Sequence, residues 1–546
     1  VDEFYYRRST GQFNFDGSQG PWAAACNATP SLPECGDSNV LALADFLAGD
    51  VSTSSISVGD AERYVSVTGV DFFAQDDWQI TPKLNINYGL RWEYFGPLHT
   101  VGTPNLGEFV DGQGLEIQGQ GVSNIFNPDH HNFAPRLGFA YQPMTGLVIR
   151  TGAGFFFDQI NMNPFLDFRP PISAADGLED NPVGPNPVDN YSRNGYNWTT
   201  AQAGGASIFP GVTTCNGNFA TDPNCLSSSQ IFNVFSVNQN FRTPYFINYN
   251  FNIEKAIGSS SVLTVGYVGS QGRKLGVMEN INQDGKFNSY FPNYGSIIQL
   301  NSEGTSNYNS LQTTYKVRQW HGVAAQFSYT WAHALDEVTE YRGVIPFDSF
   351  NLKEDYGSSD FDTRHAFTAF FSYDIPGSSH LRVLTAGWTA SGLVTVHSGQ
   401  PFNFDAGTQR PGLNLVSNPF AGVNHTFVAG VGEEWVNPAA FCIPGAIGCP
   451  GTTDPAGNVG RNEFYGPGFA DVDLSVFKTF DVVKERLRLQ LRAEMFNVFN
   501  RINLATGAGS VGSNGVVGDT IGDFNGAPGL GPGEPFNMQL AAKIIF

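Results

Sequence analysis

The chain has 546 residues, with 29 Lys and Arg against 50 Asp and Glu, and a formal net charge of -21. This acidic balance argues against nucleic acid or an anionic membrane surface as the main partner, because both would be repelled. No run of about 18 apolar residues occurs, so the sequence excludes a helical membrane span. The many Gly (63) and Phe (46) residues favour strands joined by turns over helices.

The chain opens with VDEFYYRRST, which has no basic region followed by an apolar stretch and is therefore no signal peptide. Either a signal has been removed, or the chain begins within a longer protein. Alternation of polar and apolar residues predicts a first strand over 5–16 and a second over 63–78.

The clearest strand signal lies at 84–94, which reads LNINYGLRWEY. Successive side chains of a strand point to opposite faces. One face therefore carries Leu84, Ile86, Tyr88, Leu90, Trp92 and Tyr94. The other carries Asn85, Asn87, Gly89, Arg91 and Glu93. We expect the first face to meet lipid and the second to meet an aqueous lumen.

The same alternation recurs along the chain and predicts about 14 strands. They lie near 5–16, 63–78, 82–96, 131–142, 146–158, 241–257, 259–270, 304–319, 322–333, 359–375, 382–399, 466–479, 484–499 and 536–546. The expected lipid-facing set includes Phe327, Leu489 and Leu491. The expected lumen-facing set includes Arg150, Lys316, Arg318, Arg488, Arg492 and Glu494, which are too charged for the core of a sandwich.

The links between these strands alternate between tight turns and long segments. Tight turns are expected around 79–81, 143–145, 257–259, 320–321, 376–381 and 480–483. Long loops are expected over 17–62, 97–130, 159–240, 271–303, 334–358, 400–465 and 500–535. This layout is typical of an all-β, transmembrane antiparallel β-barrel of the outer-membrane type, with short periplasmic turns and long extracellular loops.

The last strand, FNMQLAAKIIF, ends at the aromatic residue Phe546 and resembles the C-terminal strand read by the barrel-insertion machinery. A periplasmic C-terminus makes every short turn periplasmic and every long loop extracellular. Trp92 and Trp331 then fall at extracellular strand ends and Trp78 at a periplasmic end, as interfacial girdles require.

Six cysteines form three close pairs in the sequence, each within a long loop: Cys26 with Cys35, Cys215 with Cys225, and Cys442 with Cys449. Three local disulfides and an oxidising compartment are the simplest interpretation. Zinc ligation is the alternative, but it would require CxxC-like spacing with histidines nearby.

Several phrases of the sequence resemble the C-terminal barrel region of TonB-dependent outer-membrane receptors of the Oar-like group. They are ALADFLAGD (42–50), FFAQDDWQITPKLNINYGLRWEYFGP (72–97), NFAPRLGFAYQP (132–143), IRTGAGFFFDQ (149–159), SDFDTRHAFTAFFSYDIP (359–376) and RAEMFNVFNRINL (492–504).

The resemblance implies a barrel of about 22 strands around an N-terminal plug, whose TonB box couples it to inner-membrane energy. We find no plug, no TonB box and no additional N-terminal domain in this sequence, so we expect Val1 to lie inside a longer protein. A closed 14-stranded barrel is the alternative, because barrels with even numbers of strands occur from about 8 upward.

The sequence gives no support for catalysis, because it contains no GxSxG, HExxH or P-loop motif, and no cofactor is expected. Asp355, Asp360 and Asp362 could form a calcium site near His365, since hard cations prefer carboxylate oxygens. The alternative, which we favour, is a solvated loop whose Asp residues stabilise turns. Asp76 and Asp77 are adjacent in a strand and point to opposite faces, so they cannot form a catalytic pair.

These features predict a TonB-dependent outer-membrane transporter that captures a large ligand, such as a peptide, oligosaccharide or polymer fragment, with its loops. We expect 159–240 and 400–465 to make first contact. Two alternatives stay open: a surface structural or adhesion protein without transport, and a passive porin. The expected partners are outer-membrane lipid, the TonB system and an unidentified extracellular ligand.

Overall fold

The structure is a computed structural model of the whole chain. It describes residues 2–4, 12–29, 35, 38–50, 52–58, 62–100, 107–111, 113–117, 122–159, 178–182, 232–289, 294–340, 345–377, 382–405, 410–427, 433–483, 486–504, 509–510, 520–521 and 535–546. Residues 5–11 of the expected strand over 5–16, the pair Cys215 and Cys225 and most of the loop at 159–240 lie outside these residues.

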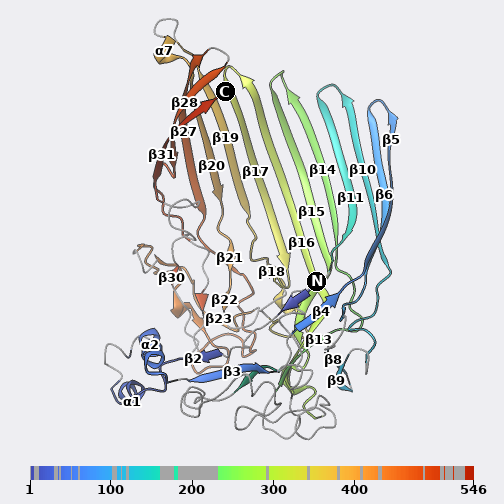
Figure 1. Cartoon of the computed structure of the whole chain (residues 1–546), viewed down its shortest axis with the longest axis vertical. Coiled ribbons are helices and arrows are strands. Elements are labelled where there is room, and N and C mark those ends of the chain that lie inside the picture. The colour runs from blue at the N-terminus through green and yellow to red at the C-terminus, as the bar shows by residue number, and fades with distance from the viewer. Residues whose placement is uncertain are drawn as a thin grey trace.

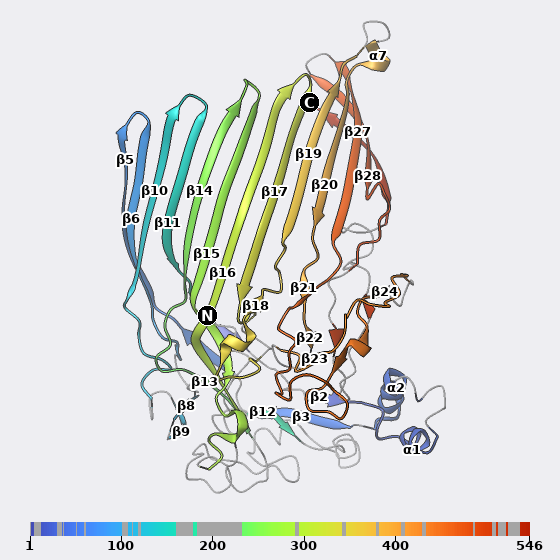
Figure 2. The same cartoon turned by 180° about the vertical axis from the view of Figure 1, so that it is seen from behind.

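One large sheet dominates the molecule, and thirteen of its strands follow one another as antiparallel neighbours. They are β5 (Gly69–Thr81), β6 (Leu84–Phe95), β10 (Asn132–Met144), β11 (Leu147–Phe157), β14 (Tyr245–Ile257), β15 (Ser261–Asn280), β16 (Tyr294–Trp320), β17 (Val323–Asp336), β19 (His365–Ile375), β20 (Trp388–His397), β27 (Phe469–Val483), β28 (Leu487–Phe496) and β31 (Asn537–Ile545). Figures 1 and 2 show them as a tall, curved wall. The all-β architecture predicted from alternation is therefore present.

The strand prediction fails at the N-terminal end. The described part of the expected strand over 5–16, β2 (Gln12–Asn14), does not join the wall but pairs with β3 (Thr53–Val58). The expected strand over 63–78 is two strands, since β4 (Glu62–Ser66) pairs with β1 (Asp2–Phe4) and only β5 enters the wall. Among the described residues, the sheet has fifteen strands, thirteen of them in the wall, which agrees with the expected number of about fourteen.

The two rims of the wall differ in the length of their connections, although the expected loop 271–303 is mostly strand, because β15 continues to Asn280 and β16 begins at Tyr294. One rim carries the short connections, such as Pro82–Lys83 between β5 and β6 and His321–Gly322 between β16 and β17. His321 and Gly322 both have positive φ (50° and 84°), the backbone that tight hairpin turns require. The other rim carries the long loops, and Figure 1 places the C-terminus at the short-turn rim.

The edges of the wall are β5 and β31, and among the described residues no pairing joins them. All thirteen residues of β5 are exposed. An edge strand with a free ladder of N–H and C=O groups is a template for further strand pairing.

The loop rim is folded and holds two buried clusters of apolar side chains. One, the first loop core, comprises Val65, Leu98, Ile125, Phe126, Phe235, Val237, Phe241, Met278, Ile298 and Leu300. The other, the second loop core, comprises Phe402, Phe404, Leu413, Val436, Ala440, Phe441, Val459 and Phe464. The first recruits residues from segments far apart in the sequence, from Val65 to Leu300, whereas the second is built within the single loop between β20 and β27. The loop rim therefore has its own tertiary structure.

Short elements surround these cores. The strands are β7 (His99–Thr100), β8 (Gly107–Val110), β9 (Gly114–Ile117), β12 (Leu178–Pro182), β13 (Phe232–Val237), β18 (Gly357–Ser358), β21 (Pro401–Phe402), β22 (Phe404–Asp405), β23 (Asn414–Leu415), β24 (Glu433–Glu434), β25 (Phe441–Cys442), β26 (Phe464–Tyr465), β29 (Gly509–Ser510) and β30 (Thr520–Ile521). The helices are α1 (Pro21–Ala28), α2 (Ser38–Ala48), η2 (Gln283–Gly285), η3 (Leu352–Asp355), α7 (Arg382–Thr385) and η4 (Pro438–Ala440). Within the described residues, no helix has the length and apolar character to cross a membrane.

Candidate functional site

The register of the wall gives it one polar face and one apolar face. Directly opposed residues of neighbouring strands share a face. From β6 the ladder runs Asn85, Ala140, Arg150 and Asn252. The same face carries every residue of the expected lumen-facing set that the ladder pairs, namely Asn85, Asn87, Arg91, Glu93, Arg150, Lys316, Arg488, Arg492 and Glu494. Arg318 follows Lys316 by two positions in β16.

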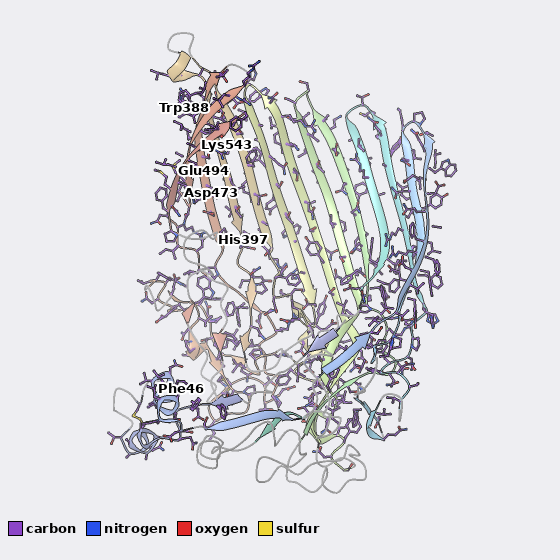
Figure 3. The ribbon with its side chains drawn as sticks, viewed as in Figure 1. Phe46, Trp388, His397, Asp473, Glu494 and Lys543 are labelled. Carbon is purple, nitrogen blue, oxygen red and sulfur yellow. A yellow bond between two sulfur atoms is a disulfide. The ribbon has the colours of Figure 1, made fainter. Side chains whose placement is uncertain are left out.

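Figure 3 labels members of this polar face at several heights of the wall, from Lys543 and Glu494 through Asp473 to His397. Its charges pair with one another. Arg91 binds Asp71 at 3.0 Å and Glu93 at 2.6 Å. Arg150 binds Glu254 at 3.0 Å and Arg492 binds Glu494 at 3.4 Å. These ion pairs satisfy much of the charge that the face would otherwise offer to a ligand.

The opposite face is apolar over the same strands. Its ladder pairs Leu84, Ile86, Tyr88 and Leu90 with Tyr141, Phe139, Leu137 and Pro135. It continues across the wall through Phe327, which opposes Tyr315, and through Leu489 and Leu491 to Ile544 and Ala542 of β31. The expected lipid-facing set therefore shares one face.

Lys478 is a cation on this apolar face that the alternation pattern did not flag. It opposes Trp388 and lies 5% exposed, with its ammonium 4.9 Å from the Trp388 ring and 5.1 Å from the Phe480 ring. Its Nζ donates to the carbonyl of Leu384 at 2.6 Å, in the connection at the short-turn rim. Long cationic side chains reach polar groups in this way while their stems stay in apolar surroundings.

At the loop rim, Arg461 forms the centre of a buried polar junction. Its side chain is 1% exposed and its Nη2 pairs with the carboxylate of Asp336, at the end of β17. Its Nη1 donates to the backbone carbonyls of Asp336 at 2.8 Å and Asp355 at 3.2 Å. Burial raises the pKa of Asp336, and the Arg461 guanidinium opposes that rise. One arginine thus joins the 398–468 loop to the loop after β17.

The three carboxylates considered for calcium belong to this junction. Asp362 is buried and accepts from the Ala334 N–H at 2.8 Å, from Arg364 Nε at 3.0 Å and from the Tyr465 hydroxyl at 3.3 Å. Asp360 accepts from Asn462 Nδ2 at 2.6 Å. His365 points elsewhere, and its Nδ1 hydrogen-bonds with the Tyr329 hydroxyl at 2.8 Å.

The carboxylate of Asp355 has different hydrogen-bond partners from those of Asp360 and Asp362. Its Oδ2 accepts from the Phe347 N–H at 2.9 Å, and burial raises its pKa to about 6. Across the described residues, no group of three or more His, Cys, Asp or Glu side chains is arranged to hold a metal ion. Asp355 and Asp362 are buried, in contrast to the solvated loop that we expected, and their hydrogen bonds to the backbone of Phe347 and Ala334 connect the loop segments.

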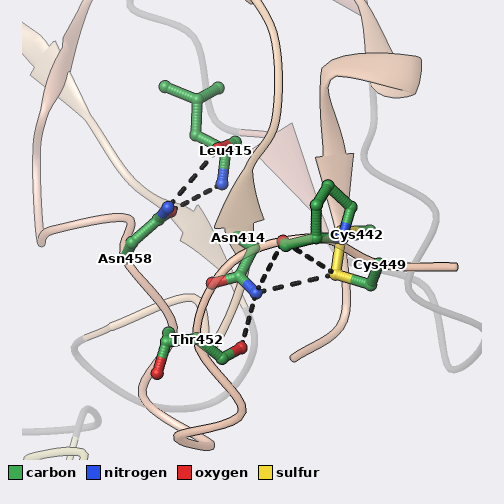
Figure 4. The surroundings of a disulfide bond; sticks show 7 residues. Asn414, Leu415, Cys442, Cys449, Thr452 and Asn458 are labelled. Atoms are coloured by element: carbon green, nitrogen blue, oxygen red, sulfur yellow. Dashed lines mark hydrogen bonds between the residues drawn. A yellow bond between two sulfur atoms is a disulfide. The ribbon is translucent and has the colours of Figure 1, made fainter. Parts of the chain in front are cut away.

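The second loop core carries a disulfide between Cys442 and Cys449 (Figure 4). Asn414 is fully buried beside it and donates through Nδ2 to the carbonyls of Thr452 at 2.8 Å and Pro450 at 3.3 Å. On the same strand, the Leu415 N–H donates to Asn458 Oδ1 at 2.6 Å. The disulfide and these amides hold the 410–460 part of the loop in one shape.

A second disulfide joins Cys26 and Cys35, between helices α1 and α2. Two of the three expected cystines are therefore present, and both lie at the loop rim. An oxidising compartment accounts for them.

The first loop core contains a buried acid, Glu279, on the part of β15 that runs past the end of β14. The last pair of those two strands is Tyr245 with Arg273. Glu279 accepts from Asn301 Nδ2 at 2.5 Å, while its Oε1 has no hydrogen-bond partner. Burial, assisted by the nearby charge of Glu303, raises its pKa to about 8.

The family of the chain follows from comparison with known proteins. A family model described as outer membrane beta barrel domain matches residues 1–539. The chain belongs to this outer membrane β-barrel family. As a member, it is a protein of the outer membrane, and its family is not one of enzymes. No curated protein sequence matches it significantly.

Solved structures similar to this chain include three receptors. The ferric-catecholate import receptor Fiu of Escherichia coli K12 has 12% identity and a TM-score of 0.39, over 88% of this chain and 45% of its own. The ferripyoverdine receptor of Pseudomonas aeruginosa has 10% identity and a TM-score of 0.42, over 88% and 39%. The siderophore receptor PiuA of Acinetobacter baumannii has 9% identity and a TM-score of 0.42, over 91% and 44%. The chain spans less than half the length of each.

Sequence reasoning missed the junction around Arg461. Arg461 lies 125 positions from its partner Asp336, and Tyr465 lies 103 positions from its partner Asp362. No local spacing in the sequence links them. A signal was present only in composition: the 400–465 loop has two basic residues, Arg410 and Arg461, and an arginine that is buried needs a partner.

Proposed function

We propose that the chain forms the wall and the extracellular loops of a TonB-dependent outer-membrane transporter that takes up a large ligand. The observation that carries the proposal is the two-faced wall with short turns at one rim and folded loops at the other. Membership of the outer membrane β-barrel family and the phrases shared with TonB-dependent receptors support it.

In this proposal the apolar face meets lipid and the polar face lines the lumen. Ladder hydrogen bonds satisfy the backbone between neighbouring strands, and closure of the barrel would have to supply partners for the edges β5 and β31, since a strand wall crosses a bilayer only without free edges. A fluorophore attached at Ile86 or Leu90 should report an apolar environment, and one at Asn87 an aqueous one. Equal emission from the two sites in the bilayer would contradict the assignment.

The loop rim is proposed as the extracellular, ligand-capturing end, and the C-terminal residue Phe546 as part of the assembly signal at the periplasmic rim. The long loops hold 33 of the 50 acidic residues and only 10 of the 29 basic residues. Their field would attract cationic ligands such as a basic peptide, would not oppose a neutral oligosaccharide, and would repel anions.

Uptake by cells tests the proposal. Cells that make the complete protein should accumulate a fluorescent peptide or oligosaccharide from a mixed set, and should lose this uptake when residues 410–462 are replaced by a short linker. Uptake should also stop in cells without TonB. A heat-modifiability assay of the outer membrane would establish that the deletion variant still inserts.

The two alternatives predict other outcomes. A passive porin would give uptake that persists without TonB and an ion conductance from the purified protein. A structural or adhesion protein would give no uptake at all, while removal of the loops would reduce attachment of cells to a surface. Either result would overturn the transport proposal.

A further inference from the structure

Two adjacent cations of β15, Arg273 and Lys274, break the alternation of their strand close to the loop rim. Successive residues of a strand ordinarily point to opposite faces, so a regular strand would separate them. The register of β15 against β16 shifts between Gly272 and Leu275, and Lys274 has a positive φ of 54°. A bulge of this kind redirects side chains, and a non-glycine residue with such a backbone often marks a functional position.

Contacts place both cations on the apolar side of the wall. Arg273 opposes Tyr245, and its Nη2 donates at 2.8 Å to Oε1 of Gln271, two positions earlier on the same face. The ammonium of Lys274 lies 5.7 Å from the centroid of the Tyr245 ring. Tyr245 belongs to the apolar face, because it lies six positions from Phe251, which the ladder connects to the lipid-facing set. Figure 2 shows β14 and β15 side by side, running up to the loop rim.

The charges of these two residues have no carboxylate partner. Arg273 Nη1 donates to the carbonyls of Gly272 at 2.7 Å and Ser306 at 3.3 Å, which are neutral acceptors. Among the described residues, Lys274 Nζ has neither a hydrogen bond nor an ion pair.

A third cation, Arg242, lies near Lys274 and pairs with Asp129 at 2.6 Å. Lys274 follows the last pair of β14 and β15 and so lies beyond the spanning part of the wall. Burial and the positive charge of Arg242 lower the pKa of Lys274. A bound anion would offset this repulsion between like charges.

The surface on the short-turn side of the two cations is aromatic and then aliphatic. The Tyr245 ring contacts those of Phe155 and Phe157, with centroids 5.9 Å and 5.5 Å away. Aromatic side chains gather where a membrane protein passes from lipid to water. Closer to the short-turn rim, the same face exposes Phe251 (46%) and Ile253 (40%). The order from the loop rim downward is therefore positive charge, aromatic rings and exposed apolar side chains, which matches the order of an anionic lipid from head group to acyl chains.

We propose that Arg273 and Lys274 bind the phosphate of an acylated lipid in the outer leaflet, whose acyl chains lie along the apolar face beneath them. This assignment rests on the proposed function, which places that face in lipid and the loop rim outside the cell. Guanidinium and ammonium groups bind phosphate through charge-assisted hydrogen bonds, and basic clusters beside a membrane-spanning surface bind anionic head groups. A lipid fits better than free phosphate, because the acidic loops repel free anions whereas acyl chains hold a lipid against the wall.

Native mass spectrometry of the purified full chain in detergent tests the proposal with three probes: lipid A that carries its phosphates, the same lipid after removal of the phosphates, and inorganic phosphate. The chain should retain the phosphorylated lipid at least about tenfold more tightly than the dephosphorylated lipid, because only the first meets both cations. An excess of inorganic phosphate should leave most of the lipid bound.

Variants assign this binding to the two cations. The double variant Arg273→Gln with Lys274→Asn should weaken retention of the phosphorylated lipid at least about tenfold. Asparagine is chosen at 274 because it tolerates positive φ. The matched control, Lys316→Gln with Arg318→Gln, removes the same charge from two exposed positions on the polar face and should retain the lipid as the unchanged chain does. Heat-modifiability reports whether each variant keeps its fold, and the comparison of the two lipids on the unchanged chain needs no variant.

Four outcomes would overturn the proposal. Equal retention of the two lipids would mean that only the apolar face binds them. Full retention by the folded double variant would place the phosphate elsewhere, and an equal loss in the control would show an effect of net charge alone. Displacement of the lipid by inorganic phosphate would make this a site for free anions. Failure of the proposed function has a different signature, since the fluorophore at Ile86 would then report water and neither lipid would be retained.

Discussion

The wall and the loop rim handle charged side chains in opposite ways. In the wall, Arg150 and Glu254 form an ion pair whose side chains are 54% and 40% exposed. At the loop rim, Arg461 and Asp336 form one whose side chains are 1% and 5% exposed. The first pair can exchange its partners for water, whereas the second cannot.

This difference indicates what holds each region together. The wall is held by a regular ladder of backbone hydrogen bonds across thirteen strands. Its side chains are therefore determined mainly by the solvent that each face meets. The loop rim has few long strands and depends on two apolar cores, two disulfides and the junction around Arg461. Single substitutions should therefore have much larger local effects at the loop rim than in the wall.

The largest effect is expected for Arg461→Ala. The substitution leaves Asp336 buried without its cation, and removing one partner of a buried ion pair typically costs about 3–5 kcal/mol. We expect faster hydrogen exchange of the backbone amides at 333–339 and 355–364, with the wall unchanged. Arg461→Lys keeps the charge but loses the planar guanidinium, so its exchange rates should lie between those of the unchanged chain and those of Arg461→Ala. Unchanged exchange in both segments would show that the junction contributes nothing to loop structure.

The next effect is a pH dependence from Glu279. Its pKa rises from 4.5 to about 8 in the folded protein, so the folded chain keeps a proton that the unfolded chain has lost. The stability of the first loop core should therefore fall as pH rises from 4.5 to about 8, by at most a few kcal/mol.

Hydrogen exchange of the amides at 232–237 and 294–300, corrected for intrinsic rates, measures this dependence. Glu279→Gln should flatten it, because the amide stays neutral at every pH. Glu254→Gln, in the exposed pair of the wall, is the matched control and should leave it in place. A core that is equally protected across this range in the unchanged chain would contradict the prediction.

A smaller effect is expected from removing the disulfide of the second loop core. Replacing Cys442 and Cys449 by serine opens a short covalent loop, with a sequence separation of 7. Closure of a loop of this size stabilises by about 2 kcal/mol. Limited proteolysis should cut faster within 443–452. The matched change of Cys26 and Cys35 should leave this segment protected, and equal cutting in both variants would mean that the effect is not local.

The sequence predicted the wall well because its pattern is local. A strand with water on one side and lipid or protein on the other must alternate polar and apolar residues. The residues from Leu84 to Tyr94 therefore identify a strand without reference to any distant partner. The tight turn at His321 and Gly322 is equally local. The N-terminal segment failed for the opposite reason: whether Gln12–Asn14 joins the wall or pairs with β3 depends on a partner about 40 positions away.

The helices were missed for a related reason. Helix α2 has no polar stripe facing water, and its one charged residue, Asp45, faces inward. A search for amphipathic periodicity expects polar residues outside and rejects such a segment. The three-carboxylate site was considered because Asp355, Asp360 and Asp362 are close in sequence, but Arg461 and Tyr465, which contact the junction, enter from a segment about 100 positions away.

The smallest effect is expected in the wall itself. Arg150→Ala removes a pair with Glu254 that crosses from β11 to β14, but both side chains are exposed. Exposed ion pairs contribute about 0–1 kcal/mol, and Glu254 remains solvated when its partner is lost. Thermal unfolding of the wall should shift little, and hydrogen exchange of β11 and β14 should stay slow because Arg150 contributes no ladder bond beyond its own backbone. A destabilisation as large as that of Arg461→Ala would mean that the polar face is as dry as the loop rim, which would remove the basis for assigning it to a water-filled lumen.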